Sequence, residues 1–236
     1  MLPKTLGSVY ALQPEEAFFC LDRCTDHSEE IIKRYADAYP ETTTTIRRYT
    51  DADGLDWNFR GAYLRRDAYA RARNDVIVNT SADIRLCPSI ARHIRGIPRR
   101  YALISFHYYE HPWNLQCFER AIINKFTQGF AGLLAVSREA WLDSEDMEEL
   151  KNIPRGEDTH LRLAIGKKHP TAHHHTHSLH LRPNESHEDH YNRGQAIYMQ
   201  VSQRPLKALI HSVVMIRPAV FVGFMHARNR DRRKQI

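Results

Sequence analysis

An apolar, β-branched run at residues 74–86 ends abruptly in small polar residues and one carboxylate, and it constrains the fold more than any other stretch. Val76, Ile77 and Val78 predict a short strand buried on both faces, as in a parallel sheet covered by helices. Ligands of open α/β sheets bind at the carboxyl ends of such strands, so Asp83 is a candidate ligand or metal contact. The alternative is that Asp83 only belongs to a turn.

The composition indicates a globular protein with an anionic partner. The chain has 236 residues and is 42% hydrophobic, which is enough to fill the core of one large α/β domain or two small ones. Its formal net charge of +6 suits nucleic acid, a nucleotide, a phospholipid surface or a phosphorylated substrate. The four cysteines lack the paired spacing of a zinc site, and nothing at the N-terminus resembles a signal peptide. We therefore predict reduced thiols in a cytoplasmic protein.

Hydrophobic patterning in the first third of the chain predicts alternating helices and strands. Asp26 and Glu29, three residues apart, form a capping box that starts the clearest helix, which ends before Pro40. The expected elements are a helix at 3–13, a strand at 16–22, this capped helix, a strand at 42–48, a helix at 62–73 and a strand at 76–78. Their order favours a parallel sheet with crossover helices.

The rest of the chain continues the alternation less regularly. A helix that begins after Thr159 is expected to stop at Gly166. The other expected elements are a helix at 89–94, a strand at 101–109, an apolar run at 118–136, a helix at 137–141, a strand at 173–181 and a helix at 188–203. An apolar stripe then covers 205–227.

Three separated stretches resemble, in this order, the family 2 glycosyltransferases of the GT-A fold. Residues 20–36, which begin Cys-Leu-Asp-Arg-Cys-Thr-Asp, are similar to the family's strand-end Asp, Ser-Thr-Asp turn and following helix. Residues 76–86 occupy the place of the DxD motif. Residues 155–164, Arg-Gly-Glu-Asp-Thr-His-Leu-Arg-Leu-Ala, resemble the ED motif at a helix start.

This resemblance implies an α/β GT-A domain, with a Rossmann-like, mostly parallel sheet flanked by helices, at residues 1–203. An amphipathic, basic extension is expected at 204–236. The family normally opens with an apolar strand that carries a Pro-x-Tyr-Asn-like motif, whereas this chain starts at the helix that follows it. We therefore expect the domain to lack the usual first strand.

The resemblance assigns donor binding to Asp22, Ser81 and Asp83. Asp22 matches the acid that hydrogen-bonds the donor's nucleobase. Asp83 matches the last Asp of DxD, which coordinates a divalent ion, Mg²⁺ or Mn²⁺, that bridges the diphosphate. Ser81 stands where the first Asp usually is, which departs from the family pattern. His180, on the strand after the ED helix, matches a histidine that is a metal ligand in part of the family, and His177 is a competing match.

The same resemblance makes Asp158 the catalytic base, with Glu157 beside it. Sugar transfer needs the acceptor hydroxyl to lose its proton as it attacks, which a positioned carboxylate can bring about. It also needs the charge of the departing diphosphate to be neutralised, which a divalent cation held by one or two carboxylates can do. The alternatives are that Asp158 is only an acid at the positive end of a helix dipole and that Asp22 is only a turn residue.

Histidines are concentrated in the second half of the chain, and most lie after His160. The run His173–His175, with His177, could bind a metal on its own. We interpret this run instead as a solvated strand face, with only His180 near the donor site.

The leading hypothesis is a glycosyltransferase that moves a sugar from a nucleotide-diphosphate donor to a hydroxyl or phosphate acceptor, with inversion. The acceptor would be a glycan or a lipid-linked molecule. The alternative is a truncated domain that binds a nucleotide or glycan without turnover. The basic tail at 228–234 is accompanied by no nucleic-acid-binding motif, so we expect no nucleic-acid partner.

The segment 205–234 is predicted to bind the inner face of an anionic membrane peripherally. Lys207, His211 and Arg217 interrupt its apolar stripe, so a helix that spans the bilayer is disfavoured. An in-plane helix would bury the apolar side at the headgroup boundary, and the basic cluster at 228–234 would add attraction to anionic lipid. The alternative is that the stripe packs on the catalytic domain as one more core helix.

Overall fold

The computed structural model describes residues 1–54, 60–95, 97, 99–110, 133–144, 157–181, 191 and 221–226, with the backbone alone at 110 and 157–160. Contacts divide the chain into two compact units. The first comprises residues 1–111 and 127–182, and the second comprises 112–126 and 183–236. The expected boundary between 203 and 204 lies outside the described residues and stays a prediction.

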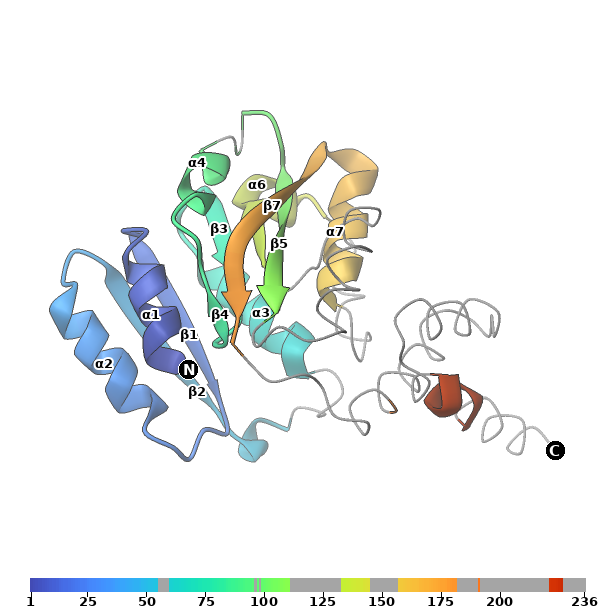
Figure 1. Cartoon of the computed structure of the whole chain (residues 1–236). Coiled ribbons are helices and arrows are strands. Elements are labelled where there is room, and N and C mark those ends of the chain that lie inside the picture. Colours follow the sequence, from blue (N-terminus) through green and yellow to red (C-terminus); the bar gives the residue numbers. More distant parts are fainter. Residues whose placement is uncertain are drawn as a thin grey trace. The chain divides into compact units, whose positions relative to one another are not determined.

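The first unit alternates helices and strands and forms two sheets (Figure 1). Its strands are β1 (Glu16–Asp22), β2 (Thr43–Tyr49), β3 (Val76–Asn79), β4 (Ile84–Arg85), β5 (Leu103–Glu110), β6 (Leu134–Ser137) and β7 (Thr171–His180). Its helices are α1 (Leu2–Tyr10), α2 (Ser28–Ala38), η1 (Asp51–Asp53), α3 (Arg60–Arg71), α4 (Ile90–Ile94), α6 (Arg138–Leu142) and α7 (Glu157–Lys168).

The smaller sheet consists of β1 and β2, which pair in parallel over seven residues. The apolar sides of α1 and α2 pack on one of its faces, where Leu6, Tyr10, Leu21 and Ile32 form a buried cluster. On α3, Asp67 accepts a hydrogen bond of 2.5 Å from the Tyr49 hydroxyl, which attaches this helix to β2. The carboxyl ends of β1 and β2 are thereby fixed between helices.

The larger sheet has the strand order β3-β6-β5-β7-β4. Its longest pairing, between β5 and β7, is parallel, and the shorter pairings β3-β6, β5-β6 and β4-β7 are antiparallel. The expectation that Val76–Val78 is buried on both faces of a parallel sheet is wrong. β3 lies at the edge of this sheet, its partner β6 is antiparallel, and its residues are half-buried because an edge strand has a neighbour on one side only.

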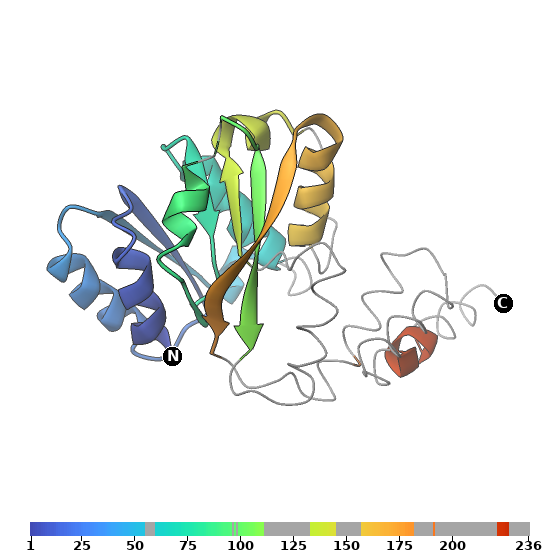
Figure 2. The same cartoon turned by 45° about the horizontal axis from the view of Figure 1, so that its top comes forward.

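Helices cover both faces of the larger sheet, which gives three layers (Figure 2). Tyr69 of α3, Trp141 of α6, and Leu161 and Ile165 of α7 surround Leu103 on one face. On the other face, residues of α4 and α1 pack against a second cluster, whose buried members are Ile84, Leu86, Ile90, Ile97, Ile104, Phe106, Leu133 and Ala135. Both α1 and α3 contact the smaller sheet as well, so these two helices link the two sheets.

Most elements expected from the pattern within these residues are confirmed, and β1 covers the predicted 16–22 residue for residue. Two helix-end predictions are wrong. Helix α7 continues through Gly166 to Lys168, because this glycine has no left-handed backbone. His27, rather than Asp26, is the N-cap of α2, and Glu29 pairs with Lys33 and Arg48 instead of closing a capping box.

The described part of the second unit comprises Tyr191 and a helical segment at 221–226. The Tyr191 hydroxyl lies 2.9 Å from Nδ1 of His226, in hydrogen-bond contact. The expected helix at 188–203 and most of the apolar stripe at 205–227 lie outside the described residues. No described helix is long and apolar enough to cross a membrane. Cys20, Cys24 and Cys87 are free thiols, as expected, and Cys117 is outside the described residues.

Candidate functional site

The structure brings together Asp83 and His180, two residues that are 97 positions apart in the sequence. Asp83 follows β3 in a turn that leads into β4, and His180 ends β7, directly opposite Ile84 of β4. The Nε2 atom of His180 lies 3.4 Å from Oδ2 of Asp83. The backbone N–H of Leu181 donates to the Asp83 carbonyl at 2.7 Å. A backbone hydrogen bond therefore holds the turn of Asp83 against the end of β7, next to the side-chain contact.

The turn that carries Asp83 is held by helix α1. The hydroxyl of Thr5, a residue that is 3% exposed, donates to the Ala82 carbonyl at 2.9 Å. One turn later, the Ser8 hydroxyl accepts from the backbone N–H of Leu86 at 2.9 Å. The two contacts bracket Asp83, which is itself 5% exposed, and restrict the position of its carboxylate.

A divalent cation fits this pair of side chains. Two protein atoms that bind one ion at about 2.0–2.2 Å lie roughly 3.0–3.5 Å apart, and the Asp83–His180 separation is within that range. A carboxylate oxygen suits Mg²⁺ and Mn²⁺, and a neutral imidazole nitrogen is the commonest metal ligand among side chains. Asp83 and His180 are therefore residues that could hold a divalent ion, and the same separation is that of an ordinary ion pair.

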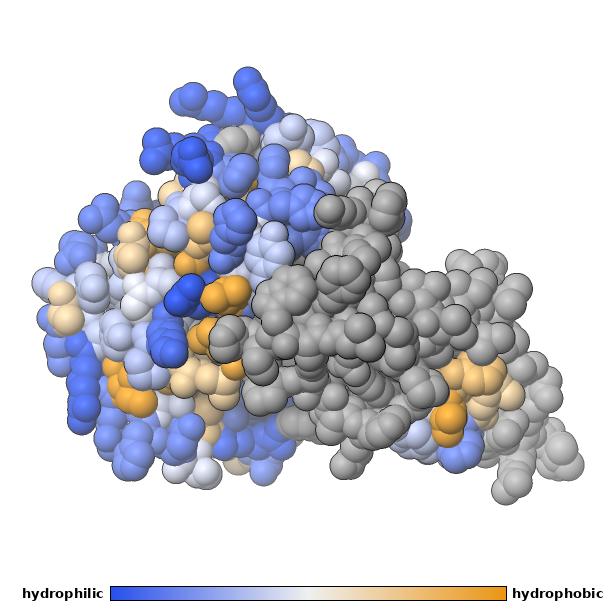
Figure 3. Space-filling view, in the orientation of Figure 1, coloured by the Kyte–Doolittle hydropathy of each residue, from blue (hydrophilic) through white to orange (hydrophobic). Residues whose placement is uncertain are grey.

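A cavity of about 190 Å³ lies where α1 meets β4 and the end of β7, and neither Asp83 nor His180 is among its lining residues. Its walls are formed by Met1, Lys4, Arg85, Leu179 and Leu181, so two cationic side chains face a partly apolar hollow. Arg85 lies two residues from Asp83, and the two leucines flank His180 in the sequence. Figure 3 shows hydrophobic and hydrophilic residues side by side on one face of the first unit. Such a surface is suited to an anionic group attached to an apolar or ring-shaped one.

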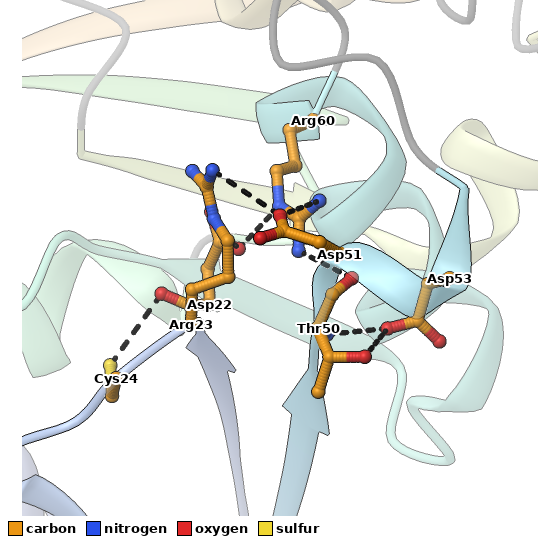
Figure 4. Close-up of polar contacts among 7 residues, drawn as sticks. All are labelled: Asp22, Arg23, Cys24, Thr50, Asp51, Asp53 and Arg60. Atoms are coloured by element: carbon orange, nitrogen blue, oxygen red, sulfur yellow. Dashed lines mark hydrogen bonds and ion pairs between the residues drawn. The ribbon is translucent and has the colours of Figure 1, made fainter.

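Asp22 ends β1 and forms ion pairs with two arginines (Figure 4). Arg60, at the start of α3, contacts Oδ1 of Asp22 through Nε and donates to the Thr50 carbonyl at 2.9 Å. Arg23 contacts the same Oδ1 at 3.2 Å. The Arg60 side chain is only 3% exposed, so Asp22 compensates a buried charge.

The remaining predicted site residues are Ser81, in the turn before Asp83, and the two acids at the start of α7. Ser81 is exposed, and its carbonyl accepts from the Ile84 N–H at 3.2 Å, which closes the turn. Glu157 and Asp158 are the first two residues of α7, as the ED resemblance implies. Their side chains lie outside the described part of the structure.

The histidine run on β7 is only partly solvated, so its interpretation as a solvated strand face is wrong. His175 and His177 are exposed, but His173 and His174 are half-buried and contact rings on opposite faces of the sheet. The ring of His174 stacks on His93 of α4 with 4.3 Å between centroids. Strand β7 is a central strand covered by α7 and α4, which buries histidines that sequence patterning cannot distinguish from surface ones.

Sequence patterns missed three residues that shape the site. Arg60, Thr5 and Ser8 each act through a partner far away in the sequence, and none belongs to a motif. The signal that was present for Thr5 and Ser8 is their spacing of three residues on a helix, which places both hydroxyls on one side. No local signal marks Arg60, because arginines are common in α3.

Comparison with known proteins supports the fold. No protein-family model matches the chain, and a search of curated proteins found no match. Among solved structures, the chain is similar to the mannosyltransferase PcManGT from Pyrobaculum calidifontis in complex with GDP-Man and Mn²⁺, with a TM-score of 0.64 and 15% identity. The similarity covers 97% of this chain and 71% of that chain. The predicted α/β fold of GT-A type is therefore confirmed.

Proposed function

We propose that this protein is a metal-dependent glycosyltransferase, of the family 2 type, that uses a nucleotide-diphosphate sugar as donor. The observation that carries the proposal is the 3.4 Å separation between Asp83, in the turn that leads into β4, and His180, at the end of β7. A carboxylate and an imidazole meet there. The fold of this chain is similar to that of a mannosyltransferase whose solved structure contains GDP-Man and Mn²⁺. The ligand-binding edge of such a sheet is where the carboxyl ends of its parallel strands lie.

Each protein group has a separate task in the proposed reaction. Asp83 and His180 would hold Mg²⁺ or Mn²⁺, which when bound neutralises the charge of the donor diphosphate. Lys4 and Arg85, which line the cavity between α1 and β4, would add positive charge for the phosphates. Oδ2 of Asp22 accepts a hydrogen bond from the nucleobase, while Arg60 and Arg23 fix the carboxylate through Oδ1.

Asp158 is the proposed base that takes the proton from the acceptor hydroxyl, with Glu157 secondary. It is the second residue of α7, and the N-terminal end of this helix lies toward the ends of β5 and β7 because α7 is antiparallel to both strands. A base on the side of the sugar opposite the diphosphate produces inversion at the anomeric carbon. The acceptor is a glycan or lipid-linked hydroxyl or phosphate.

The membrane part of the proposal concerns residues 205–234. Within them the structure describes only the helical segment 221–226, in which Phe224 is buried and Val222 is 47% exposed. An exposed valine beside a basic tail suits the in-plane contact with anionic lipid. Burial of Phe224 suits the alternative, a helix that packs on protein.

Calorimetric titration of nucleotides and nucleotide sugars into the full chain, with and without Mn²⁺, tests the proposal. We expect binding that requires Mn²⁺ and that is lost in Asp83→Ala and in His180→Ala. The matched control is His177→Ala, an exposed histidine on the same strand, which should leave binding unchanged. Mn²⁺-independent binding that Asp83→Ala does not weaken would refute the donor site.

Transfer and donor hydrolysis, measured on the same samples, decide between an enzyme and a non-catalytic binding domain. Asp158→Asn keeps the shape of the side chain but removes the base, so turnover should fall about 10²–10⁴-fold while donor affinity stays near that of the parent. If the parent binds a nucleotide sugar tightly and neither transfers nor hydrolyses it with any acceptor tried, the domain is a binding module instead.

A further inference from the structure

A second group of metal-ligating side chains lies at the centre of the larger sheet. It consists of His107 on β5 and of His173 and His175 on β7, and one ring nitrogen from each of the three lies within 4.8 Å of the others. The two strands are parallel neighbours, with His107 paired to His175 and Ser105 paired to His173. Residues two apart on a strand share a face, so this register places the three rings together.

This histidine cluster is separate from the Asp83–His180 pair. It lies on the same face as Leu103, which α7 covers through Leu161 and Ile165. Tyr108, the neighbour of His107, packs instead with the cluster of Ile84 and has its ring 5.5 Å from that of His180. The two groups of potential ligands therefore use opposite sides of β5.

The three rings are arranged so that a small adjustment gives a shared coordination site. The centroids of His107 and His173 are 3.9 Å apart with the rings perpendicular, and those of His107 and His175 are 4.3 Å apart with the rings nearly parallel. A tetrahedral ion with bonds of about 2.0–2.1 Å needs nitrogens roughly 3.4 Å apart. Since the nitrogens of the three rings lie within 4.8 Å of one another, each pair must approach by about 1.4 Å or less. His107 is 4% exposed and fixed, whereas His175 is exposed and can rotate.

The contact between Ser105 and His173 prepares the second ring for metal binding. Nδ1 of His173 lies 2.9 Å from the Ser105 hydroxyl, and a proton on Nδ1 leaves Nε2 as the atom with the free lone pair. Nε2 of His173 is buried and has no hydrogen-bond partner among the residues that the structure describes. A histidine ligand usually donates its other ring N–H to an oxygen acceptor that fixes the ring, and the Ser105 hydroxyl oxygen is placed to be that acceptor.

The protonation state of His173 also suits a ligand. Burial, and then the neighbouring His175, His174 and Arg162, lower the pKa of His173 to about 4. Its ring is therefore neutral at pH 7, as coordination requires. Arg162 of α7 brings a positive charge toward the same cluster, which disfavours a second cation and limits the affinity.

We propose that His107, His173 and His175 bind a transition-metal ion of the Zn²⁺ class, with Ser105 as the residue that orients His173. Three imidazoles and no carboxylate among the described ligands select Zn²⁺, Co²⁺, Ni²⁺ or Cu²⁺ over Mg²⁺, Ca²⁺ or Mn²⁺, which prefer oxygen. Three protein ligands leave a fourth position for water. The ion joins β5 to β7 and so stabilises the strand that ends at His180.

Titration of the chelator-treated full chain with Zn²⁺ and with Co²⁺, whose visible absorption reports imidazole coordination, tests the site. We expect one equivalent that Mn²⁺ does not displace, with a rise in Tm on Zn²⁺ binding. His175→Ala changes an exposed residue and should weaken binding about tenfold or more, and Ser105→Ala should weaken it about tenfold. Arg162→Gln should tighten it at least about twofold, because a repelling charge is removed.

Two controls keep the assignment specific. His177→Ala removes an exposed histidine of the same strand, and Asp83→Ala removes the other candidate metal site, so both should keep the equivalent of Zn²⁺ or Co²⁺ and the Co²⁺ spectrum. Because His107 is buried and its replacement could unfold the chain, the double variant His173→Gln/His175→Ala, checked by circular dichroism, serves as the decisive variant. Binding that survives in this folded double variant, or that His177→Ala weakens equally, overturns the proposal.

Discussion

The guanidinium group of Arg60, which is 3% exposed, forms an ion pair with the carboxylate of Asp22 at the end of β1. Two segments 38 positions apart thus meet at the place where the sequence predicts nucleobase binding. The residue proposed for the donor also holds α3 against the smaller sheet, so its functional and structural contributions must be separated by measurement.

Asp22→Ala should therefore destabilise the fold as well as weaken nucleotide binding. Loss of the partner of a fully buried charge costs roughly 3–5 kcal/mol, and because Asp22 is 26% exposed and Asp51 lies 3.9 Å from Arg60, we expect about 2–3 kcal/mol here. Urea unfolding measures this loss. Asp51→Ala, which removes an acid that is 84% exposed in the same group, should change stability by less than about 0.5 kcal/mol.

The double variant Asp22→Ala/Arg60→Met separates the two contributions. It removes both charges, so it should recover most of the stability that Asp22→Ala alone loses. Nucleotide affinity should stay low in the double variant, because the acceptor oxygen is still missing. Recovery of binding together with stability would show that Asp22 acts only by compensating Arg60.

Glu29 should titrate far below an ordinary glutamate. Its contacts with Arg48 and then with Lys33, whose Nζ lies 2.8 Å from Oε1, lower the pKa of Glu29 to about 2. Because the pKa is lower in the folded state, these ion pairs add stability that is complete above about pH 4.5 and is lost as the pH falls toward 2. Carbon-13 NMR titration of the Glu29 carboxyl measures the midpoint directly.

Arg48→Ala removes the largest cause and should raise the Glu29 midpoint more than Lys33→Ala does. Both shifts should shrink at high salt, since the pairs lie at the surface. An unchanged midpoint in Arg48→Ala would contradict the assigned contact.

The sequence predicts a structural feature well when neighbouring residues determine it, and poorly when distant residues do. Glu16–Asp22 was predicted residue for residue, because an apolar run that closes on an acid carries its own boundaries. The end of α7 was missed, because a glycine stops a helix only where the backbone turns left-handed, and at Gly166 it does not. Arg60 was missed because its partner is set by tertiary packing.

The candidate site followed the same rule. Asp83 was singled out from its place after a strand and from the family resemblance, and His180 from the resemblance alone. The structure puts the two in contact. The pattern could not show that His173 is half-buried, because burial of a polar ring depends on which helix covers its strand. The antiparallel pairing of β3 was equally hidden, since strand direction in a sheet is set by partners distant in the sequence.

Gly223→Ala should disrupt the second unit near Tyr191. A Cβ atom at residue 223 would lie 2.0 Å from the Tyr191 carbonyl oxygen and 2.9 Å from its carbonyl carbon, and these are backbone atoms that cannot rotate away. Separation of the two segments also breaks the Tyr191–His226 contact, and we expect a loss of about 1–3 kcal/mol. Hydrogen exchange of the amides at 191 and 221–226 reports the loss.

Gly166→Ala is the matched substitution on α7. Its Cβ would lie 3.7 Å from Cγ2 of Thr171, an ordinary contact, so the exchange of glycine for alanine within a helix should be neutral or stabilising by up to about 1 kcal/mol. Faster exchange in Gly166→Ala than in Gly223→Ala would contradict both packing assignments.

Thr5→Val should weaken metal binding at Asp83 without a change in any proposed ligand. Valine fills the buried space of threonine but cannot donate to the Ala82 carbonyl, so the turn that carries Asp83 loses one of its two contacts with α1. We expect a loss of about 1–2 kcal/mol in stability. Because residues that orient metal ligands change affinity about tenfold or more, Mn²⁺ affinity in the presence of nucleotide should fall about tenfold.

Thr42→Val is the control, since Thr42 is 4% exposed and donates to the Pro14 carbonyl at 2.8 Å beside the smaller sheet. It should cost similar stability and leave Mn²⁺ affinity unchanged, and an equal fall in both variants would mean that affinity follows global stability rather than the position of Asp83.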